Sequence, residues 1–395
     1  MTAESASDFA ALEAQAQALM ATFTNEGYEL VAPAILQPAR LFLDVVGEQL
    51  RARTYIFTDP TGAELCLRPD LTVPTCRLHL ERQSEPQAAA IPARYCYNGS
   101  AFRVQPGGAT RTHPREFRQA GIEAFGGRDA EQADAETIAL TARALRASGL
   151  TTFRVRLGDL GLLAAMIDAL GVPERWRQRL RHTFPRPEAF RAELHRLGDA
   201  GLRRRELPEE LLRAFALAGP DDDARRRAVE TQLVASGVDL VGSRSADEIA
   251  DGLADQIADS DTPSLAPAKI ALIESYLAVS GPPREAARRI KDIARATGHD
   301  IADRLARFVR RLDLIEAQGL DLGGAEFSAE FGRDLAYYTG FVFEIVAPEV
   351  GPQSPVAGGG RYDALLRAVG APSDIAAVGA AIHTERLLAV RAGRH

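Results

Sequence analysis

The distribution of strand-forming segments along the chain restricts its fold more than any other feature of the sequence. β-rich runs occur before residue 159 and after residue 321, whereas residues 159–321 form helical stretches rich in Arg, Ala and Leu that Pro and Gly separate. The regular alternation of strand and helix that marks a doubly wound fold is absent. We therefore expect an α+β fold in which residues 1–158 and 322–395 share one mostly antiparallel sheet flanked by helices, with a helical insertion domain at 159–321.

Local patterns predict the individual elements. Apolar residues at helical spacing predict an amphipathic helix over 8–24, which Asp8 can cap and Gly27 can end. Turn residues at 59–62 predict a hairpin over 53–70. The other expected elements are a strand over 28–36 broken at Pro33, a hairpin over 94–126, a helix over 129–148, strands over 151–158 and 325–349, a glycine-rich loop at 358–366 and a strand-to-helix segment at 378–388.

Composition limits the class of protein. The chain has 395 residues, 46% of them hydrophobic, and a formal net charge of −7. It can bury a sizeable core, and it lacks the basic excess of proteins that grip long nucleic acids. Its three cysteines form no CxxC pair, which favours reduced thiols over a disulfide framework. The sequence starts without a basic and apolar leader, and no apolar run could span a bilayer, so we expect a cytoplasmic protein.

The segment LRPDLTVP (67–74) is the first candidate for binding chemistry. Asp70 and Thr72 are alternate residues, and in an extended segment both side chains would point the same way. A carboxylate and a hydroxyl on one face suit an amine or imidazole ligand. A capped turn explains the same residues equally well.

The hairpin over 102–123 is the second candidate. Arg103, Arg111 and Arg115 surround a glycine-bearing loop, where guanidinium groups could clamp a phosphate or carboxylate. Gln119 and Glu123 lie four residues apart on the returning strand and therefore on one face. Buried there, they would need polar partners, which a ligand can supply. The alternative is a solvated hairpin face.

Two further clusters lie near the C-terminus. Tyr337 and Tyr338 are adjacent on an expected strand, so we expect them to face opposite sides, and Arg333 on the same apolar stretch calls for an anion. The glycines at 358–360 allow a ligand close approach to the backbone, or simply form a tight turn. Because no catalytic triad, Walker loop or metal-ligand spacing is present, we expect no catalytic residue, metal or cofactor.

Taken in order, these segments resemble the catalytic core of class II aminoacyl-tRNA synthetases, most specifically histidyl-tRNA synthetase. The resemblance covers about residues 8–158 and 322–390. The matching segments are YELVAPAIL (28–36) with motif 1, which packs the family's dimer; LRPDLTVP (67–74) with the histidine-holding LRPEGT; FR…REFRQAGIEAFG (102–126) with motif 2; GRDLAYYTGFVFE (332–344) with RGLDYY…VFE; GGGRYD (358–363) with AGGRYD; and VGAAIHTERL (378–387) with motif 3.

Departures from the synthetase pattern fall on the nucleotide side. Gln105 replaces the motif 2 Glu that helps to fix ATP, and Ala336 replaces the Asp of RGLDYY. His383 replaces the motif 3 Gly that makes room for adenine, an overpacking that costs about 1–3 kcal/mol, although Arg386 is kept. The resemblance thus implies a degenerate nucleotide site at Gln105, His383 and Arg386. The residues that it assigns to histidine binding are Asp70, Thr72, Arg103, Gln119, Glu123, Arg333, Tyr337 and Tyr338.

Only nine residues follow Arg386, too few for the anticodon-binding domain of the synthetase. A retained amino-acid half without these parts resembles the regulatory subunits of ATP phosphoribosyltransferase, the first enzyme of histidine biosynthesis. The resemblance implies a non-catalytic subunit with a homodimeric core in a hetero-oligomer. It would bind histidine, support the short-form catalytic subunit and relay feedback inhibition, without membrane or tRNA binding.

Two alternatives stay open at this point. One is an enzyme, either a short histidyl-tRNA synthetase or another amino-acid adenylating ligase, which the retained Arg103 and Arg386 favour. The other is a module that binds structured RNA through the Arg-rich helical insertion, although interleaved aromatic residues are few there.

Overall fold

The structure is a computed structural model of the chain. It describes residues 5–43, 48–83, 92–110, 113–184, 186–199, 213, 217, 222–235, 251–252, 254–255, 258–259, 262–296, 298, 300–332, 337–348 and 354–391. The chain divides into two compact units, which we describe separately. Unit 1 comprises residues 1–169 and 275–395, and unit 2 comprises residues 170–274.

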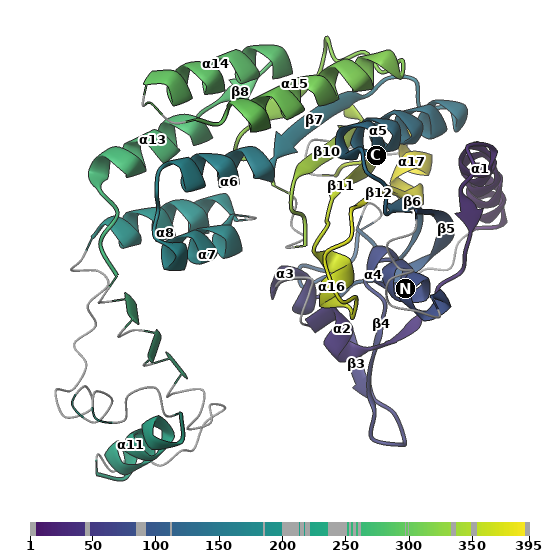
Figure 1. Cartoon of the computed structure of the whole chain (residues 1–395). Helices are drawn as coiled ribbons and strands as arrows, with labels where there is room; N and C mark the ends of the chain where they lie inside the picture. Colours follow the sequence, from purple (N-terminus) through teal and green to yellow (C-terminus); the bar gives the residue numbers. More distant parts are fainter. Residues whose placement is uncertain are drawn as a thin grey trace. The chain divides into compact units, whose positions relative to one another are not determined.

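A large sheet forms the framework of unit 1 (Figure 1). Its strands, in spatial order, are β1 (Glu29–Leu30), β5 (Ala93–Phe102), β6 (Glu116–Phe125), β12 (Ala377–His383), β11 (Ala357–Arg361), β10 (Phe341–Val346), β7 (Arg154–Asp159), β9 (Glu326–Ser328) and β8 (Ser280–Gly281). All neighbours pair antiparallel except β1 with β5 and β7 with β9. Because β6 pairs with β12, the two ends of the chain share one mostly antiparallel sheet, and the α+β prediction is confirmed.

Unit 1 also contains several α-helices. They are α1 (Ala6–Asn25), α2 (Ala39–Leu43), α3 (Glu48–Arg51), α4 (Thr72–Arg82), α5 (Ala130–Ala147), α6 (Leu160–Ala169), α14 (Pro283–Ala296), α15 (Ala302–Ala317), α16 (Leu365–Ala368) and α17 (Thr384–Arg391). α1 contacts both α5 and α17, and all three contact the central strands. The expected helix over 8–24 is confirmed, but Ser5 rather than Asp8 caps it, since the Ser5 hydroxyl accepts from Asp8 N at 3.1 Å.

A second sheet consists of β2 (Leu36–Pro38), β4 (Glu64–Leu67) and β3 (Tyr55–Thr58). The predicted hairpin over 53–70 is confirmed as β3 and β4. Asp59 closes its turn, because one carboxylate oxygen accepts from Thr61 N at 2.8 Å and from Ala63 N at 2.9 Å. The break expected at Pro33 in the strand over 28–36 is confirmed, because β1 and β2 are separate, and the two strands join different sheets.

Two local predictions are wrong. The glycines expected in a loop at 358–366 lie in β11, a strand inside the large sheet. Crowding explains why glycine is needed there: a Cβ on Gly359 would lie 2.1 Å from the Gly379 carbonyl oxygen of β12. The segment around Asp70 is not extended, because α4 begins at Thr72.

Unit 2 is helical. Its described helices include α7 (Glu174–Thr183), α8 (Pro187–Gly198) and α11 (Asp222–Ala235), and α13 (Pro267–Leu277) spans its boundary with unit 1. Trp176 is fully buried and donates through Nε1 to the Pro263 carbonyl at 2.7 Å. Arg175 and Arg179 both pair with Asp259, so ion pairs occupy these two basic residues.

The expected insertion at 159–321 extends beyond unit 2 on both sides. α6 and α15 contact each other, and α15 also packs on α5 of unit 1. Among the described helices, none is both long and apolar enough to cross a membrane.

Candidate functional site

The carboxyl group of Glu123 forms the centre of the candidate site. Glu123 lies on β6 with 1% of its surface exposed. Thr72 donates to Oε1 at 2.8 Å, Tyr97 donates to the same oxygen at 2.9 Å, and the Tyr362 hydroxyl donates to Oε2. The start of α4, the middle of β5 and the residue after β11 therefore converge on one side chain.

Glu123 retains capacity to accept a further hydrogen bond. Each carboxylate oxygen offers about two acceptor positions. Among the described residues, two donors fill Oε1, whereas one hydroxyl donates to Oε2 and leaves one position open. Burial raises the pKa of Glu123, the three hydroxyl donors lower it and the charge of Asp70 raises it, and together they place it at about 7. Near neutral pH the group can therefore either hold or release a proton.

Asp70 supplies a second buried carboxyl group. It is 3% exposed, and its Oδ1 accepts from Val73 N at 3.2 Å, which fixes the side chain at the first turn of α4. Its Oδ2 is buried and accepts no hydrogen bond from the described residues. Burial raises the pKa of Asp70, whereas the nearby charge of Arg103 acts to lower it. The capped turn, not the extended segment, is therefore the correct local structure.

Arg103 is positioned beside this carboxyl group. Its Nε donates to the Pro69 carbonyl at 2.9 Å, and its guanidinium lies 5.2 Å from the centre of the Phe117 ring. Of the other arginines expected around the hairpin loop, Arg115 is exposed and Arg111 lies outside the described residues. Among the described arginines around the hairpin loop, Arg103 is thus the one that lies beside the Asp70 carboxyl group.

Gln119 lies on β6 four residues before Glu123, as predicted, and it is 3% exposed. The solvated hairpin face is therefore excluded for this pair. The Gln119 Oε1 atom is buried and accepts no hydrogen bond from the described residues. Side chains on a strand alternate, and the intervening side of β6 faces α1, since Arg118 pairs with Glu13 of that helix at 2.5 Å.

The tyrosine pair lies next to the same site. Tyr337 and Tyr338 are both buried, with ring centres 4.9 Å apart, and the Tyr337 ring lies 5.6 Å from that of Tyr362. The expectation that they face opposite sides is wrong, because the chain at Tyr337 forms a turn rather than a strand. The predicted Arg333 lies outside the described residues, as does Ala336.

The structure describes all three residues that were predicted to form a degenerate nucleotide site. His383 pairs in register with Gln119, and its ring lies 5.2 Å from the Phe117 ring. Gln105 accepts from Arg53 and donates through Nε2 to the Pro114 carbonyl at 3.0 Å, so its amide closes the base of the hairpin loop. Arg386 donates to the Pro355 carbonyl at 2.9 Å.

Sequence reasoning missed the two tyrosines that hold Glu123. Tyr97 and Tyr362 are fully buried, and burial raises the pKa of both phenols well above their ordinary value. For Tyr362 the signal was available, because it is part of the GGGRYD segment that was singled out only for its glycines. Tyr97 carried no such signal beyond its place on a strand.

A buried ion-pair network behind the site was also missed. Asp134 of α5 accepts from Arg311 of α15 at 2.8 Å and from Arg361 of β11 at 2.9 Å. Arg311 also donates to Asp159 at 2.8 Å, and Arg361 to Asp363 at 2.8 Å. Burial alone would lower the pKa of Arg311, but the charges of Asp134 and Asp159 outweigh it and raise the pKa. The network fixes β11 and so the position of the adjoining Tyr362.

Comparison with known proteins decides the family. A family model described as histidyl-tRNA synthetase matches residues 5–239 and 224–387. The ATP phosphoribosyltransferase regulatory subunit of Mesorhizobium japonicum is 38% identical over 98% of both chains, and that of Brucella anthropi is 36% identical over 93% of this chain and 95% of its own. This chain belongs to the family of ATP phosphoribosyltransferase regulatory subunits.

Solved structures agree with this family in fold. The ATP phosphoribosyltransferase regulatory subunit/histidyl-tRNA synthetase of Bacillus halodurans superposes with a TM-score of 0.67 at 20% identity, covering 100% of this chain and 82% of that one. The histidyl-tRNA synthetase of Nostoc gives 0.60 at 15% identity, covering 97% and 72%. The predicted synthetase-like fold and the regulatory-subunit family are therefore confirmed, and a non-catalytic role is favoured over the alternative of a short synthetase.

Proposed function

We propose that this regulatory subunit binds histidine in the site around Glu123 and Asp70 and transmits its presence to a short-form catalytic partner. The observation that carries the proposal is an excess of buried acceptors. Asp70 Oδ2 and Gln119 Oε1 receive no hydrogen bond from the described residues, and Glu123 Oε2 receives one. Leaving a buried acceptor without a donor costs about 1–3 kcal/mol, so the site favours a ligand rich in N–H groups.

Histidine matches this requirement. Its ammonium group and imidazole N–H would donate to the two carboxylates, and its carboxylate would pair with Arg103 at the edge of the site. The rings of Tyr337 and Tyr362, which pack edge to face with centres 5.6 Å apart, provide an apolar wall for the imidazole. Arg333 stays a predicted ligand of the carboxylate.

Calorimetric titration with histidine tests this site. Glu123→Gln and Asp70→Asn each remove one charged acceptor at nearly constant volume. A hydrogen bond to a charged group contributes about 1.5–3 kcal/mol, so we expect each variant to bind histidine at least about tenfold more weakly. Glu116→Gln, an exposed residue at the start of the same strand, is the matched control and should bind normally. Wild-type affinity in both site variants would refute the assignment.

We further propose that the chain does not activate its amino acid with ATP. The His383 and Phe117 rings face each other beside Gln119, where the resemblance assigns the adenine slot. We expect ATP–pyrophosphate exchange in the presence of histidine to stay at background for the purified chain. Robust exchange would restore the synthetase-like alternative.

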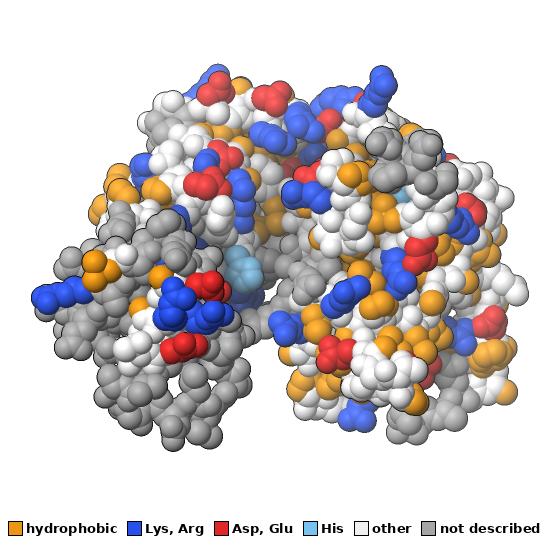
Figure 2. Space-filling model, turned by 60° about the horizontal axis from the view of Figure 1, so that its bottom comes forward, with side chains coloured by type: hydrophobic (Ala, Val, Ile, Leu, Met, Phe, Trp, Pro, Cys, Tyr) orange, Lys and Arg blue, Asp and Glu red, His pale blue; other side chains and the backbone are white. Residues whose placement is uncertain are grey.

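A homodimeric core is part of the proposal. The outer face of the small sheet is apolar and partly exposed (Figure 2 brings this end of unit 1 forward). In the register of the three strands, the residues of this face are Leu36, Pro38, Tyr55, Phe57, Leu65 and Leu67. Leu36 and Phe57 are 51% and 40% exposed. An exposed apolar sheet face favours association, and its first strand begins at Leu36, the last residue of the segment that resembles motif 1.

The state of the three cysteines is consistent with a protein that resides in a reducing compartment. Cys66, Cys76 and Cys96 are all buried free thiols, which is the usual state of cysteine in the cytoplasm. We therefore assign the complex to the cytoplasm.

A further inference from the structure

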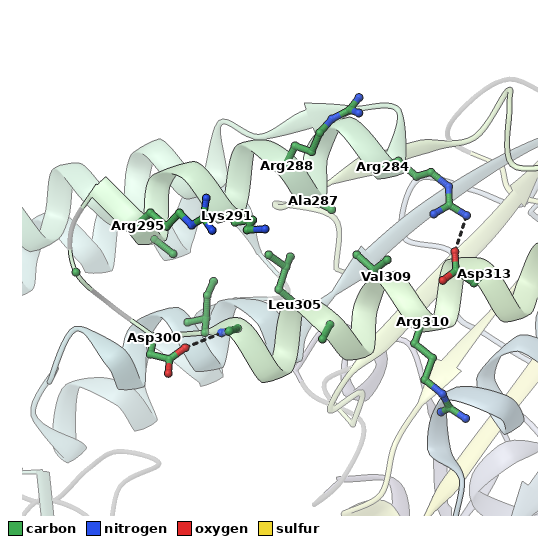
Figure 3. A pocket seen from close by; sticks show the side chains of 15 residues that line it. Arg284, Ala287, Arg288, Lys291, Arg295, Asp300, Leu305, Val309, Arg310 and Asp313 are labelled. Carbon is green, nitrogen blue, oxygen red and sulfur yellow. Dashed lines mark hydrogen bonds and ion pairs between the residues drawn. The ribbon is translucent and has the colours of Figure 1, made fainter.

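A groove between α14 and α15 lies outside the candidate site (Figure 3). It encloses about 920 Å³. The two helices run for 14 and 16 residues, which at about 1.5 Å per residue corresponds to a length of about 20 Å. A groove of this length exceeds what a single small anion would need.

The groove has an apolar floor. Ala287 of α14 and Leu305 and Val309 of α15 line it between the two helices. Leu305 is 8% exposed, so the floor is continuous with the packing between the helices. An occupant therefore needs an apolar stripe of its own.

The rim of the groove is strongly basic although the whole chain is acidic. Five of the lining residues are basic, namely Arg284, Arg288, Lys291, Arg295 and Arg310, and two are acidic, namely Asp300 and Asp313. The acids are already engaged. Asp300 accepts from Ala302 N at 2.9 Å, and Asp313 pairs with Arg284 at 2.7 Å.

Lys291 and Arg295 provide the accessible positive charge. Both are exposed, and neither forms an ion pair with a residue that the structure describes within 4 Å. They lie four residues apart, hence on one side of α14. In a chain of net charge −7, this concentration of positive charge would attract an acidic surface.

None of the described residues that line the groove is aromatic. Single-stranded nucleic acid is usually held by stacking of bases on aromatic rings in addition to positive charge. An apolar floor with a basic rim instead complements an amphipathic helix, whose apolar stripe fits the floor and whose acidic flanks meet the rim. Protein, rather than RNA, is the occupant that these residues favour.

We propose that the α14–α15 groove docks an acidic amphipathic helix of the catalytic partner subunit. This inference rests on the proposed function for the identity of the partner. It assigns the partner a binding surface on α14 and α15, separate from the side chains that hold histidine.

Charge reversal tests the groove. In Lys291→Glu/Arg295→Glu we expect the purified catalytic subunit to bind at least about tenfold more weakly by analytical ultracentrifugation. The wild-type complex should weaken with added salt, and the variant should lose most of that dependence. Arg128→Glu/Arg304→Glu makes the same change in net charge at exposed residues outside the groove, and it should bind as the wild type does. Thermal unfolding and histidine titration verify that each variant is folded.

A thiol placed in the groove identifies the occupant. Because all three native cysteines are buried, Ala306→Cys adds an accessible thiol for a photo-crosslinker, with Ala317→Cys, outside the groove on the same helix, as control. We expect Ala306→Cys to crosslink to a partner segment with acidic residues at helical spacing.

The outcomes separate the two proposals. If the wild-type chain forms no complex with the catalytic subunit, the proposed function and this inference fail together. If the wild type and the charge-reversal variant bind the subunit equally, only the groove assignment fails. If the reversal instead abolishes binding of structured RNA and leaves the subunit bound, the groove belongs to nucleic acid and the inference is overturned.

Discussion

At the scale of single residues, the main feature is a carboxyl group that three hydroxyl groups hold in a dry environment. Thr72, Tyr97 and Tyr362 all donate to Glu123. Their hydrogen bonds favour the charged form, but desolvation outweighs them and the pKa rises to about 7. A site built this way is close to balance between two protonation states at physiological pH.

This balance predicts a pH-dependent stability. The ordinary pKa of the carboxyl group is 4.5, and in the folded chain it is about 7. Between these values the folded state binds the extra proton, so the free energy of unfolding falls as the pH rises from about 4.5 to 7 and is level above. At about 1.4 kcal/mol per pKa unit, the fall attributable to Glu123 is roughly 3 kcal/mol.

Urea unfolding at pH 5, 6, 7 and 8 measures this effect. Glu123→Gln should lose less stability than the wild type between pH 5 and 7, because the amide does not titrate. Asp70, whose pKa burial also raises, acts in the same direction and stays in both proteins. Identical pH profiles for the two proteins would contradict the assignment.

The sequence predicted some of these residues and not others for clear reasons. Gln119 and Glu123 share a face because a strand alternates strictly, and that rule needs no tertiary information. Asp70 was assigned to an extended segment, although its carboxylate caps a helix that contains Pro74 in its first turn. Tyr97 reaches Glu123 only after β5 and β6 pair, and Tyr362 only after β11 joins β12, so neither contact is visible locally.

At the scale of elements, the buried network ties a helix, a strand and a second helix to one carboxylate. Asp134 is fully buried and accepts from two arginines that lie far from it in the sequence, Arg311 and Arg361. Such long-range pairs are invisible to periodicity, which explains why the two hairpins and the helices over 8–24 and 129–148 were predicted correctly while this network was not. The glycine-rich strand β11 was missed for a related reason, since its crowding comes from β12.

Removing the shared carboxylate should be costly. In Asp134→Ala both arginines lose their common partner inside the core, and breaking a buried pair typically costs about 3–5 kcal/mol. We expect a loss of this size in the free energy of unfolding from urea titration. Asp374→Ala, which breaks the exposed pair with Arg367, is the control and should cost at most about 1 kcal/mol. Equal losses would show that the network does not stabilise the fold.

At the scale of the whole molecule, the six motifs predicted the synthetase-like core, because motifs in this order along the chain are typical of one particular sheet. The boundaries of the helical insertion were predicted less well from the sequence. The helical pattern of the insertion includes α6, α14 and α15, yet these three helices belong to unit 1. Helical periodicity reveals that a face is buried but not which element buries it.

The apolar face of the small sheet leads to a prediction about the oligomeric state of the protein. Leu36→Asp/Phe57→Asp places two charges on that face, and desolvating them would oppose association. We expect sedimentation equilibrium to show a dimer for the wild type and a monomer for the variant. Thr58→Asp, at an exposed residue next to Phe57, should remain dimeric. A dimer that survives the double substitution would place the interface elsewhere.

Arg310 and Arg311 are consecutive residues of α15. Arg310 lines the groove and pairs with Asp129 at 2.6 Å, whereas Arg311 holds Asp134 and, through it, the strand that ends next to Tyr362. One helix therefore lines the proposed docking groove and also holds the network behind the proposed histidine site. If histidine and the partner bind as we propose and histidine changes the affinity for the partner, thermodynamic reciprocity requires the partner to change the affinity for histidine by the same factor.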